Sequence, residues 1–440
     1  MQRTLVGELG GQVGKTVSIS GWVDVRRDHG KLIFFDIRDR SGKVQAVCSG
    51  AILADAEKLR PEWVVTLEGI VNERPEKMRV DGQNGNIELA VAKIAVLAKA
   101  AELPFDLSAD LNLDTYLDNL PLTLRTPLAR GVFNIQATVV EAFRETLREQ
   151  GFIEFQAPAL VGADVEGGAA SFAVDYYYGK KAFLATSPQL YKQIMVGTLE
   201  RVFATPKVFR GEKHATTRHL SEYSSLDFEM GFIKDHIEVM AVIESVVRAM
   251  VGAVTSKHAD FFTARGVQLP LVPEQPFPVM KLREAQKILG AGEEPDLEPE
   301  QERAICEWAK KEHGSDFIFI THYPVAKRPF YTYEDENNPG YTKSFDLLFR
   351  GLEITTGGQR IHEYDTLVAA AKAKGLDPDK FSFYLQAFKY GMPPHGGSAT
   401  GLERFTARML ELPNVKEATL FPRDLNRIDI LLHESDTVEE

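Results

Sequence analysis

Three segments of the chain place arginine beside polar or glycine-rich loops, a combination suited to binding polyphosphate. In the first segment, residues 208–212, Arg210 stands on a predicted strand. Further basic residues follow in a polar loop: Lys213, His214, Arg218 and His219. Because a guanidinium stays charged and presents a fork of N–H groups, arginine binds phosphate oxygens in pairs. The segment therefore predicts a nucleotide site, with an exposed hairpin loop and surface ion pairs as the alternative.

The second segment, residues 344–354, predicts a hairpin that turns near Arg350 and places Asp346 opposite Glu353. Like charges that face each other across a ladder are unfavourable unless a cation neutralises them. Mg²⁺ shared with substrate phosphates is the usual remedy, because it prefers carboxylate oxygens. The alternative is that both carboxylates point outward and pair with surface lysines. A glycine-rich run, residues 355–360, follows the hairpin.

The third segment, residues 391–405, joins a proline turn and closely spaced glycines to a predicted helix that carries Arg404. Glycine lets the backbone approach a ligand, and the N-terminus of a helix favours anions. The segment predicts another part of a nucleotide site, with a plain loop-to-helix junction as the alternative. His395 is expected to be a structural turn residue. The sequence contains neither a P-loop nor a Rossmann glycine motif.

The pattern of helices and strands around these groups predicts an α+β protein with more than one domain. Residues 1–102 are typical of three strands, a short helix and two strands, which is the order of an OB-fold barrel. Residues 103–127 are rich in proline and aspartate and are expected to form a hinge. In residues 128–440 strands alternate with helices. Within them, residues 270–320 are expected to be a small helical insertion of little chemical interest.

Composition excludes several classes of protein. The chain has 440 residues, 44% of them hydrophobic, and a net charge of −12. Two cysteines, Cys48 and Cys306, cannot build a disulfide framework or a cysteine-rich zinc site. No apolar run approaches the length of a membrane span, so we expect no membrane partner and a cytoplasmic protein. The acidic balance argues against nucleic acid, but a basic cluster between Arg26 and Lys43 is either a binding surface or a solvated strand face.

The segments rich in arginine and glycine resemble the ordered motifs of class II aminoacyl-tRNA synthetases. Residues 151–158 resemble motif 1, residues 209–229 motif 2 and residues 391–405 motif 3. The wider resemblance is to the aspartyl-tRNA synthetase family of the archaeal and eukaryotic-like type, and it includes residues 113–119 and 187–193. It implies an N-terminal OB-fold that binds the anticodon and a class II catalytic domain, an antiparallel sheet flanked by helices. The chain is too short for the large insertion of the bacterial-type enzymes.

The resemblance implies an ATP site made from the three motifs. Arg210 would bind the α-phosphate, and Arg218 and His219 the outer phosphates. Tyr223 and Arg404 would sandwich the adenine, since a guanidinium and an aromatic ring can both stack on it. The residues assigned to ATP are Arg210, Glu212, Arg218, His219, Leu220, Tyr223, Glu353 and Arg404. The catalytic residues implied are Arg210, Glu212 and Arg404.

The resemblance also implies a Mg²⁺ site and an aspartate site. The Mg²⁺ ligands would be Asp346, Glu353 and Thr356. The residues assigned to L-aspartate are Glu166, Ser187, Gln189, Lys192, Arg210, Asp227, Thr356 and Arg360. Of these, Lys192 and Arg360 would receive the side-chain carboxylate. An amide offers no charge to two cations and would lose about 1.5–3 kcal/mol per charge-assisted bond, which favours aspartate over asparagine.

The N-terminal barrel would bind the tRNA anticodon. Phe34 resembles the family residue that stacks on an anticodon base, and Gln45 and Glu88 resemble residues that hydrogen-bond bases. The alternative for Phe34 is barrel core. His29 and Pro75 resemble the non-discriminating form of the enzyme. That form charges both tRNA(Asp) and tRNA(Asn) and relies on an amidotransferase to complete asparaginyl-tRNA.

Pro158 in motif 1 resembles a residue that packs at a homodimer interface. Motif 3 departs from the family at residues 398–400, where Ser-Ala-Thr replaces glycine and larger apolar residues, so details of the adenine pocket are open. The alternatives are an asparaginyl or lysyl enzyme, a catalytically inactive tRNA-binding paralogue, and a free-standing ligase that makes asparagine. The full set of predicted catalytic residues argues against the inactive paralogue, and the intact barrel argues against the free-standing ligase.

Overall fold

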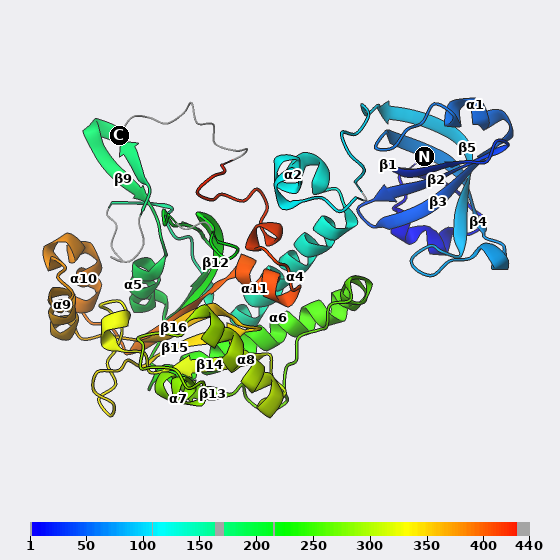
Figure 1. Ribbon diagram of the computed structural model, residues 1–440. Coiled ribbons are helices and arrows are strands. Elements are labelled where there is room, and N and C mark those ends of the chain that lie inside the picture. The colour runs from blue at the N-terminus through cyan, green and yellow to red at the C-terminus, as the bar shows by residue number, and fades with distance from the viewer. Residues whose placement is uncertain (1, 108, 163–170, 214–215, 429–440) are drawn as a thin grey trace. The chain divides into compact units, whose positions relative to one another are not determined.

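The computed structural model describes residues 2–107, 109–162, 171–213 and 216–428. Two compact units, Met1–Ala109 and Asp110–Glu440, make up the chain (Figure 1). Within the described residues, none of the helices combines the length and the hydropathy needed to cross a bilayer.

The N-terminal unit is a closed five-stranded barrel with the strand order β1-β2-β3-β5-β4. Its strands are β1 (Thr16–Asp28), β2 (Leu32–Asp39), β3 (Gly42–Ser49), β4 (Val64–Glu73) and β5 (Ile87–Ala98), with the short helix α1 (Leu53–Ala56) between β3 and β4. Side chains alternate between the two faces of a strand, so Ile33, Phe35 and Ile37 fill the barrel while Phe34 lies on its outer face. The predicted OB-fold is confirmed.

The second unit begins with two short helices, α2 (Leu113–Asp118) and α3 (Leu120–Thr123), within the expected hinge. The long helix α4 (Pro127–Glu149) follows. Thr126 caps its N-terminus by accepting a hydrogen bond from Ala129 N at 3.3 Å, and proline occupies the first helical position, where its missing N–H costs nothing. At the other end Gly151 has φ of 81°, which lets the chain turn toward the sheet.

A nine-stranded sheet organises this unit, in the order β13-β14-β15-β16-β17-β12-β10-β6, with β11 pairing to β12. The strands are β6 (Ile153–Glu154), β10 (Arg201–Ala204), β11 (Lys207–Phe209), β12 (Glu222–Gly231), β13 (Val279–Lys281), β14 (Phe317–Thr321), β15 (Ser344–Phe349), β16 (Leu352–Arg360) and β17 (His395–Gly401). The pairs β13–β14 and β10–β6 are parallel. The sheet is therefore mixed, antiparallel in its centre and parallel at both ends, and not wholly antiparallel as expected.

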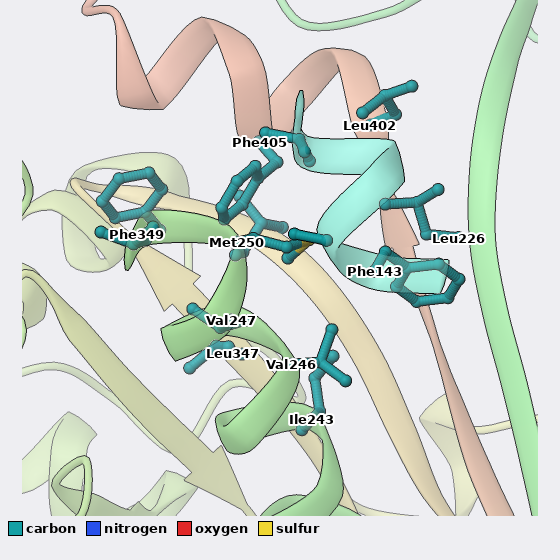
Figure 2. Packing of buried hydrophobic residues seen from close by; sticks show 14 of the residues in the cluster. Phe143, Leu226, Ile243, Val246, Val247, Met250, Leu347, Phe349, Leu402 and Phe405 are labelled. Atoms are coloured by element: carbon teal, nitrogen blue, oxygen red, sulfur yellow. The ribbon is translucent and has the colours of Figure 1, made fainter. Parts of the chain in front are cut away.

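One face of the sheet is covered by α4, α6 (His236–Arg265) and α11 (Leu402–Met409). Figure 2 shows the resulting core, in which Phe143 of α4, Met250 of α6 and Phe405 of α11 lie near Leu226 of β12. Along β12 the even-numbered apolar residues belong to this core. The odd-numbered Asp227 and Glu229 are therefore directed to the opposite face, where burying two carboxylates needs compensating charge.

Smaller elements surround the opposite face. They are a three-stranded sheet, β7 (Leu160–Val161), β8 (Ala173–Tyr176) and β9 (Lys180–Leu184), and the helices α5 (Gln189–Leu199), α7 (Leu282–Ile288), α8 (Pro299–His313), α9 (Tyr364–Ala373) and α10 (Ser382–Lys389). Residues 270–320 contain α7 and α8 but also β13 and β14 of the main sheet. The expectation of a purely helical insertion is wrong, because the buried apolar run Phe317–Thr321 joins the sheet beside β15.

Gly397→Ala should destabilise the second unit by about 2 kcal/mol or more, because a Cβ there would lie 2.1 Å from Phe228 O and 2.3 Å from Glu229 Oε2. Gly252→Ala is the matched control, since Gly252 stands in α6 with open space around it and alanine favours helix by up to ~1 kcal/mol. Urea unfolding followed by circular dichroism measures both. Equal stability of the two variants would contradict the close packing of β17 on β12.

Candidate functional site

A pocket lies on the face of the sheet opposite the hydrophobic core. Tyr223 and Ser225 of β12 line it, whereas Leu226 and Phe228 of the same strand belong to the core. The predicted ATP and Mg²⁺ residues that line this pocket are Arg210, Glu212, Arg218, His219, Leu220, Tyr223, Glu353, Thr356 and Arg404. Segments that are up to about two hundred residues apart in the sequence therefore meet at one site.

Arg210 directly follows β11, and its backbone N–H donates to Ser221 O at 2.8 Å, which fixes the start of its loop. The guanidinium lies 5.7 Å from the centre of the Tyr223 ring, and its Nη1 is 3.9 Å from Glu212 Oε1. The side chain is 43% exposed. In this structure Tyr223 therefore stacks with Arg210, while the predicted sandwich pairs it with Arg404 around a bound adenine.

Arg218 and Arg404 lie together on another side of the pocket. Arg404 Nε donates to Arg218 O at 3.4 Å, and Arg218 Nη1 donates to Glu302 Oε2 at 3.1 Å. Glu302 belongs to α8, in the region expected to have little chemical interest, yet it holds a residue that lines the pocket. Burial raises the pKa of Glu302 even though Arg218 acts to lower it. In the sequence Glu302 is one of several acidic residues on a predicted amphipathic helix, and this pattern does not predict an ion pair with Arg218.

The hairpin of β15 and β16 brings two carboxylates close, but in a different register from the predicted one. The turn at Arg350 and Gly351 pairs Glu353 with Leu348, and a register shift between Leu347 and Leu348 then pairs Asp346 with Thr356. Asp346 and Glu353 are therefore not directly opposite each other. An irregularity in a ladder moves every later pairing by one residue, and the alternation of the sequence does not reveal it.

Arg328 neutralises part of this acidic hairpin. Its Nη2 lies 2.7 Å from Asp346 Oδ2, its Nη1 donates to Thr356 Oγ1 at 3.2 Å, and its guanidinium stacks 3.8 Å from the centre of the Tyr323 ring. Arg328 was missed in the sequence because it stands in an irregular loop outside any motif. An internal cation thus provides part of the charge compensation that the sequence assigned to Mg²⁺ alone.

The remaining oxygens of the hairpin suit a divalent cation. Burial, and after it the charge of Asp346, raises the pKa of Glu353 to about 7. Asp346 Oδ1 is buried and has no hydrogen-bond partner among the described residues. Within those residues no group of three or more metal-ligating side chains forms a closed cage. Glu353 lines the pocket, and carboxylate oxygens are the donors that Mg²⁺ prefers at nucleotide sites.

Beneath the pocket lies a buried cluster of two cations and two anions. Lys192 Nζ is 2.9 Å from Asp227 Oδ2 and 3.3 Å from Glu229 Oε2. Arg360 Nε is 2.9 Å from Glu229 Oε1. Lys192, Asp227 and Glu229 are completely buried, and Arg360 is 6% exposed. Although burial acts to raise it, the charges of Arg360 and Lys192 hold the pKa of Glu229 below its usual value.

The cluster connects to the pocket and keeps polar groups available. Ser225, which lines the pocket, donates its hydroxyl hydrogen bond to Asp227. Gln189 Oε1 accepts from Arg360 at 3.4 Å, and the backbone N–H of Gln189 donates to Ser187 Oγ at 3.0 Å. Gln189 Nε2 and Ser398 Oγ are buried without a hydrogen-bond partner among the described residues. Such groups are costly unless a ligand or water binds them.

The predicted aspartate residues fall into three groups. Lys192, Asp227 and Arg360 form the cluster, with Gln189 in contact and Ser187 beside it. Arg210 and Thr356 line the adjoining pocket. Glu166 lies outside the described residues. Sequence reasoning missed Glu229 as a member, although its position two residues after Asp227 on a predicted strand places it on the same face.

His395 is fully buried at the start of β17. Its Nε2 is 3.0 Å from Gln193 Nε2, and its Nδ1 is 2.9 Å from Pro393 O. Burial lowers the pKa of His395 to about 4, so the ring is neutral at physiological pH. A neutral ring that accepts from Gln193 and donates to Pro393 holds the turn before β17, which agrees with the structural role expected for it.

The barrel carries the predicted anticodon residues on one part of its surface. Gln45 of β3 and Glu88 of β5 face each other in the register, and Gln45 Nε2 donates to Glu88 Oε2 at 3.0 Å. The ring of Phe34 meets the ring of His29 edge to face, with centroids 5.6 Å apart. His29 and Pro75 are exposed, the first after β1 and the second after β4. Phe34 is thus not core, and its role in binding bases stays a prediction.

Residues 112–425 match the family described as tRNA synthetases class II (D, K and N), and residues 17–97 match the OB-fold nucleic acid binding domain. The aspartate–tRNA(Asp/Asn) ligase of Thermus thermophilus is 44% identical over 97% of this chain and 99% of its own. The aspartate–tRNA(Asp) ligase of Thermococcus kodakarensis is 40% identical over 94% and 96%. The crystal structure of asparaginyl-tRNA synthetase from Pyrococcus horikoshii with asparaginyl-adenylate has a TM-score of 0.90 at 33% identity, covering 97% and 99%.

Glu302→Ala should weaken ATP binding about three- to ten-fold, because Arg218 loses the carboxylate that orients it toward the pocket. Isothermal titration calorimetry with ATP measures the dissociation constant. Glu300→Ala is the matched control, since Glu300 lies on the same helix with its side chain 91% exposed. Tighter ATP binding by Glu302→Ala would contradict this role, because it would mean that the carboxylate mainly repels the triphosphate.

Proposed function

The chain belongs to the class II tRNA synthetases of the aspartate, lysine and asparagine group, and from this premise we propose that it is an aspartate–tRNA ligase. It would activate L-aspartate with ATP and transfer the aspartyl group to tRNA. The observation that carries the proposal is the buried pair Lys192 and Arg360 beside a pocket lined by Arg210, Arg218 and Arg404. A dicarboxylic amino acid and a polyphosphate are the two ligands that such a site fits.

The first step needs positioning and charge neutralisation more than chemical participation by the protein. The α-carboxylate oxygen of aspartate attacks the α-phosphorus of ATP, the bond to the β-phosphate oxygen breaks, and pyrophosphate leaves. Arg210, 43% exposed at the pocket, is placed to bind the α-phosphate as negative charge develops on it. Arg218 and His219 would bind the outer phosphates, and Arg404 would bind the adenine opposite Tyr223. The second step releases AMP when the terminal ribose hydroxyl of tRNA attacks the adenylate.

The cluster under the pocket favours aspartate as the amino acid. Asp227 and Glu229 already balance Lys192 and Arg360 one to one, so a substrate that brings a carboxylate and an ammonium group leaves the total charge unchanged. The carboxylate would approach the two cations, and the ammonium group would approach Asp227. With the α-carboxylate directed to Arg210 in either case, asparagine would bring to the cluster the ammonium group and an uncharged amide, and a buried excess charge is costly.

An asparaginyl enzyme is the competing function, and the likeness to the Pyrococcus horikoshii structure favours it. The sequence relatives favour aspartate, since the Thermus and Thermococcus proteins are named aspartate–tRNA ligases at 44% and 40% identity, against 33% for the asparaginyl structure. Lys192 also favours aspartate, because its positive charge would attract a carboxylate. Shared backbone geometry at a TM-score of 0.90 fits either substrate, because the discrimination lies in single side chains.

Mg²⁺ would be held by Asp346 and Glu353, with Thr356 nearby. The fit rests on the unpartnered Asp346 Oδ1 and on the raised pKa of Glu353, about 7, which a cation would lower. A Mg²⁺ ion held by these residues would neutralise part of the charge of the triphosphate. Arg328 keeps Asp346 oriented by holding its other oxygen at 2.7 Å.

The tRNA would be bound through its anticodon by the barrel, with Phe34 as the stacking residue and Gln45 and Glu88 as hydrogen-bonding residues. His29 and Pro75 support charging of both tRNA(Asp) and tRNA(Asn), as the name of the Thermus relative states for that protein. An organism that uses this route needs an amidotransferase to convert aspartyl-tRNA(Asn). The proposal therefore includes functional coupling to such an enzyme.

We propose a homodimer as the working form. β6 ends the order of the main sheet, its Ile153 is 48% exposed, and Pro158 after it is exposed too. An outer strand with unpaired backbone groups favours pairing with another chain. A groove on the exposed side of α4, lined by Phe133, Ala137 and Val140, adds apolar surface next to this edge.

Aspartate should stimulate ATP–pyrophosphate exchange at least a hundred-fold more efficiently than asparagine or lysine. The reason is that its side-chain carboxylate would form two charge-assisted bonds, with Lys192 and Arg360, of about 1.5 kcal/mol or more each. Exchange of labelled pyrophosphate into ATP measures this directly. Arg404→Ala should abolish exchange and leave tRNA binding intact, which separates an enzyme from a binding-only paralogue. Stimulation by asparagine and not by aspartate would overturn the choice of substrate.

Purified wild-type protein should aspartylate tRNA(Asp) and tRNA(Asn) with kcat/KM values within about ten-fold of each other. A barrel that tolerates both anticodons discriminates between them by about 1.4 kcal/mol of free energy or less. Acid-gel analysis of the charged tRNAs measures both. Substituting a longer side chain at His29, as in His29→Gln, should lower charging of tRNA(Asn) selectively. Absence of aspartyl-tRNA(Asn) from wild-type reactions would show the discriminating form.

A further inference from the structure

A strained turn stands at the tip of the hairpin formed by β8 and β9. Tyr178 has φ of 60° and ψ of 35°, Gly179 has φ of 69°, and Lys180 N donates to Tyr177 O across them. Tyr178 and Gly179 are therefore consecutive left-handed residues in a three-residue loop, residues 177–179, between the paired Tyr176 and Lys180. Such positions favour asparagine or aspartate before the glycine, because a bulky L-residue is strained at positive φ.

Packing does not explain the tyrosine at this position. Tyr178 is 98% exposed and Tyr177 is 74% exposed, so neither side chain gains stability by burial. Tyr176 is 48% exposed and meets the Tyr177 ring edge to face at 5.0 Å. Tyr178, strained at positive φ and without compensating burial, lowers the stability of the hairpin tip. Strain that the fold does not need is typical of sites with a function.

The chemistry of the tip suits a single-stranded nucleic acid. Lys180 and Lys181 are exposed and follow the tyrosines directly, and Lys180 pairs with Tyr176 in the register. Aromatic rings stack on unpaired bases, and neighbouring lysines bind the phosphates between them. Duplex recognition would need a wider basic surface, whereas a narrow aromatic tip fits an extended single strand.

The hairpin rises from the rim of the candidate active site. Its strand β9 continues through Ala185, whose carbonyl accepts from Phe209 N at 2.9 Å, one residue before Arg210. The chain then reaches Ser187 and Gln189 beside the buried charge cluster. At the rise of an extended strand the tip lies roughly 20 Å along the chain from Ala185. Figure 1 shows the hairpin projecting from the body of its unit.

We propose that the tip, residues 176–181, binds the unpaired 3′ end of tRNA as that end enters the active site, with Tyr177 and Tyr178 stacking on bases. The inference rests on the proposed function, because only a tRNA substrate brings a single strand to this rim. The contact serves transfer and not activation. Aspartyl-adenylate forms without tRNA, so the hairpin has no part in that step.

Tyr178→Asn provides a sharp test, because asparagine suits the left-handed position and the substitution should preserve or improve folding. In the double variant Tyr177→Ser/Tyr178→Asn, we expect the KM for tRNA in aminoacylation to rise about ten-fold, consistent with loss of base stacking. Aspartate-dependent ATP–pyrophosphate exchange should be unchanged. Phe232→Asn is the matched control, since Phe232 is also left-handed, with φ of 59°, and 69% exposed, but no tyrosine or pair of lysines adjoins it.

Three results would overturn the proposal. One is an unchanged KM for tRNA in the double variant, and another is an equal rise in the Phe232→Asn control. The third is a change in molar mass by light scattering, which would make the tip a contact between copies of the chain. A wild-type protein without aspartate-dependent exchange would refute the proposed function instead, and this readout does not involve the hairpin.

Discussion

The ion pairs around Glu229 are the constraint on which the rest of the catalytic unit depends. A carboxylate that is completely buried at the centre of a sheet is tolerated because Arg360 and Lys192 lie 2.9 Å and 3.3 Å from it. Those contacts form only when β12, β16 and α5 pack so that these three side chains meet. They require glycine at position 397 too, where any side chain would collide with the carboxylate.

Alternation along β12 gives this strand one apolar face and one charged face. The apolar residues of β12 pack against α4, α6 and α11, while its acidic residues are forced to the other side, where they attract the cations. The pocket then lies over the cluster, with Ser225 connecting the two. In the proposed function, amino acid and nucleotide would be bound by adjoining parts of a single sheet face, which would bring the two reacting groups together.

The acidic hairpin of β15 and β16 has the features that the proposed Mg²⁺ site needs. Arg328 satisfies one oxygen of Asp346, while the other oxygen has no partner among the described residues. Burial keeps the pKa of Glu353 near 7. A cation that arrives with phosphates would find two carboxylates already oriented, so binding costs little reorganisation.

The sequence by itself determined what depends on neighbours along the chain. Alternation predicted the barrel strands, the glycines and arginines predicted the pocket segments, and their order indicated the family. Tertiary structure alone decided the register of β15 on β16, the choice of Phe35 over Phe34 as core, and the partners Glu302 and Arg328. Local periodicity constrains which side chains share a face, whereas a bulge or an ion pair across 84 positions depends on how distant segments pack.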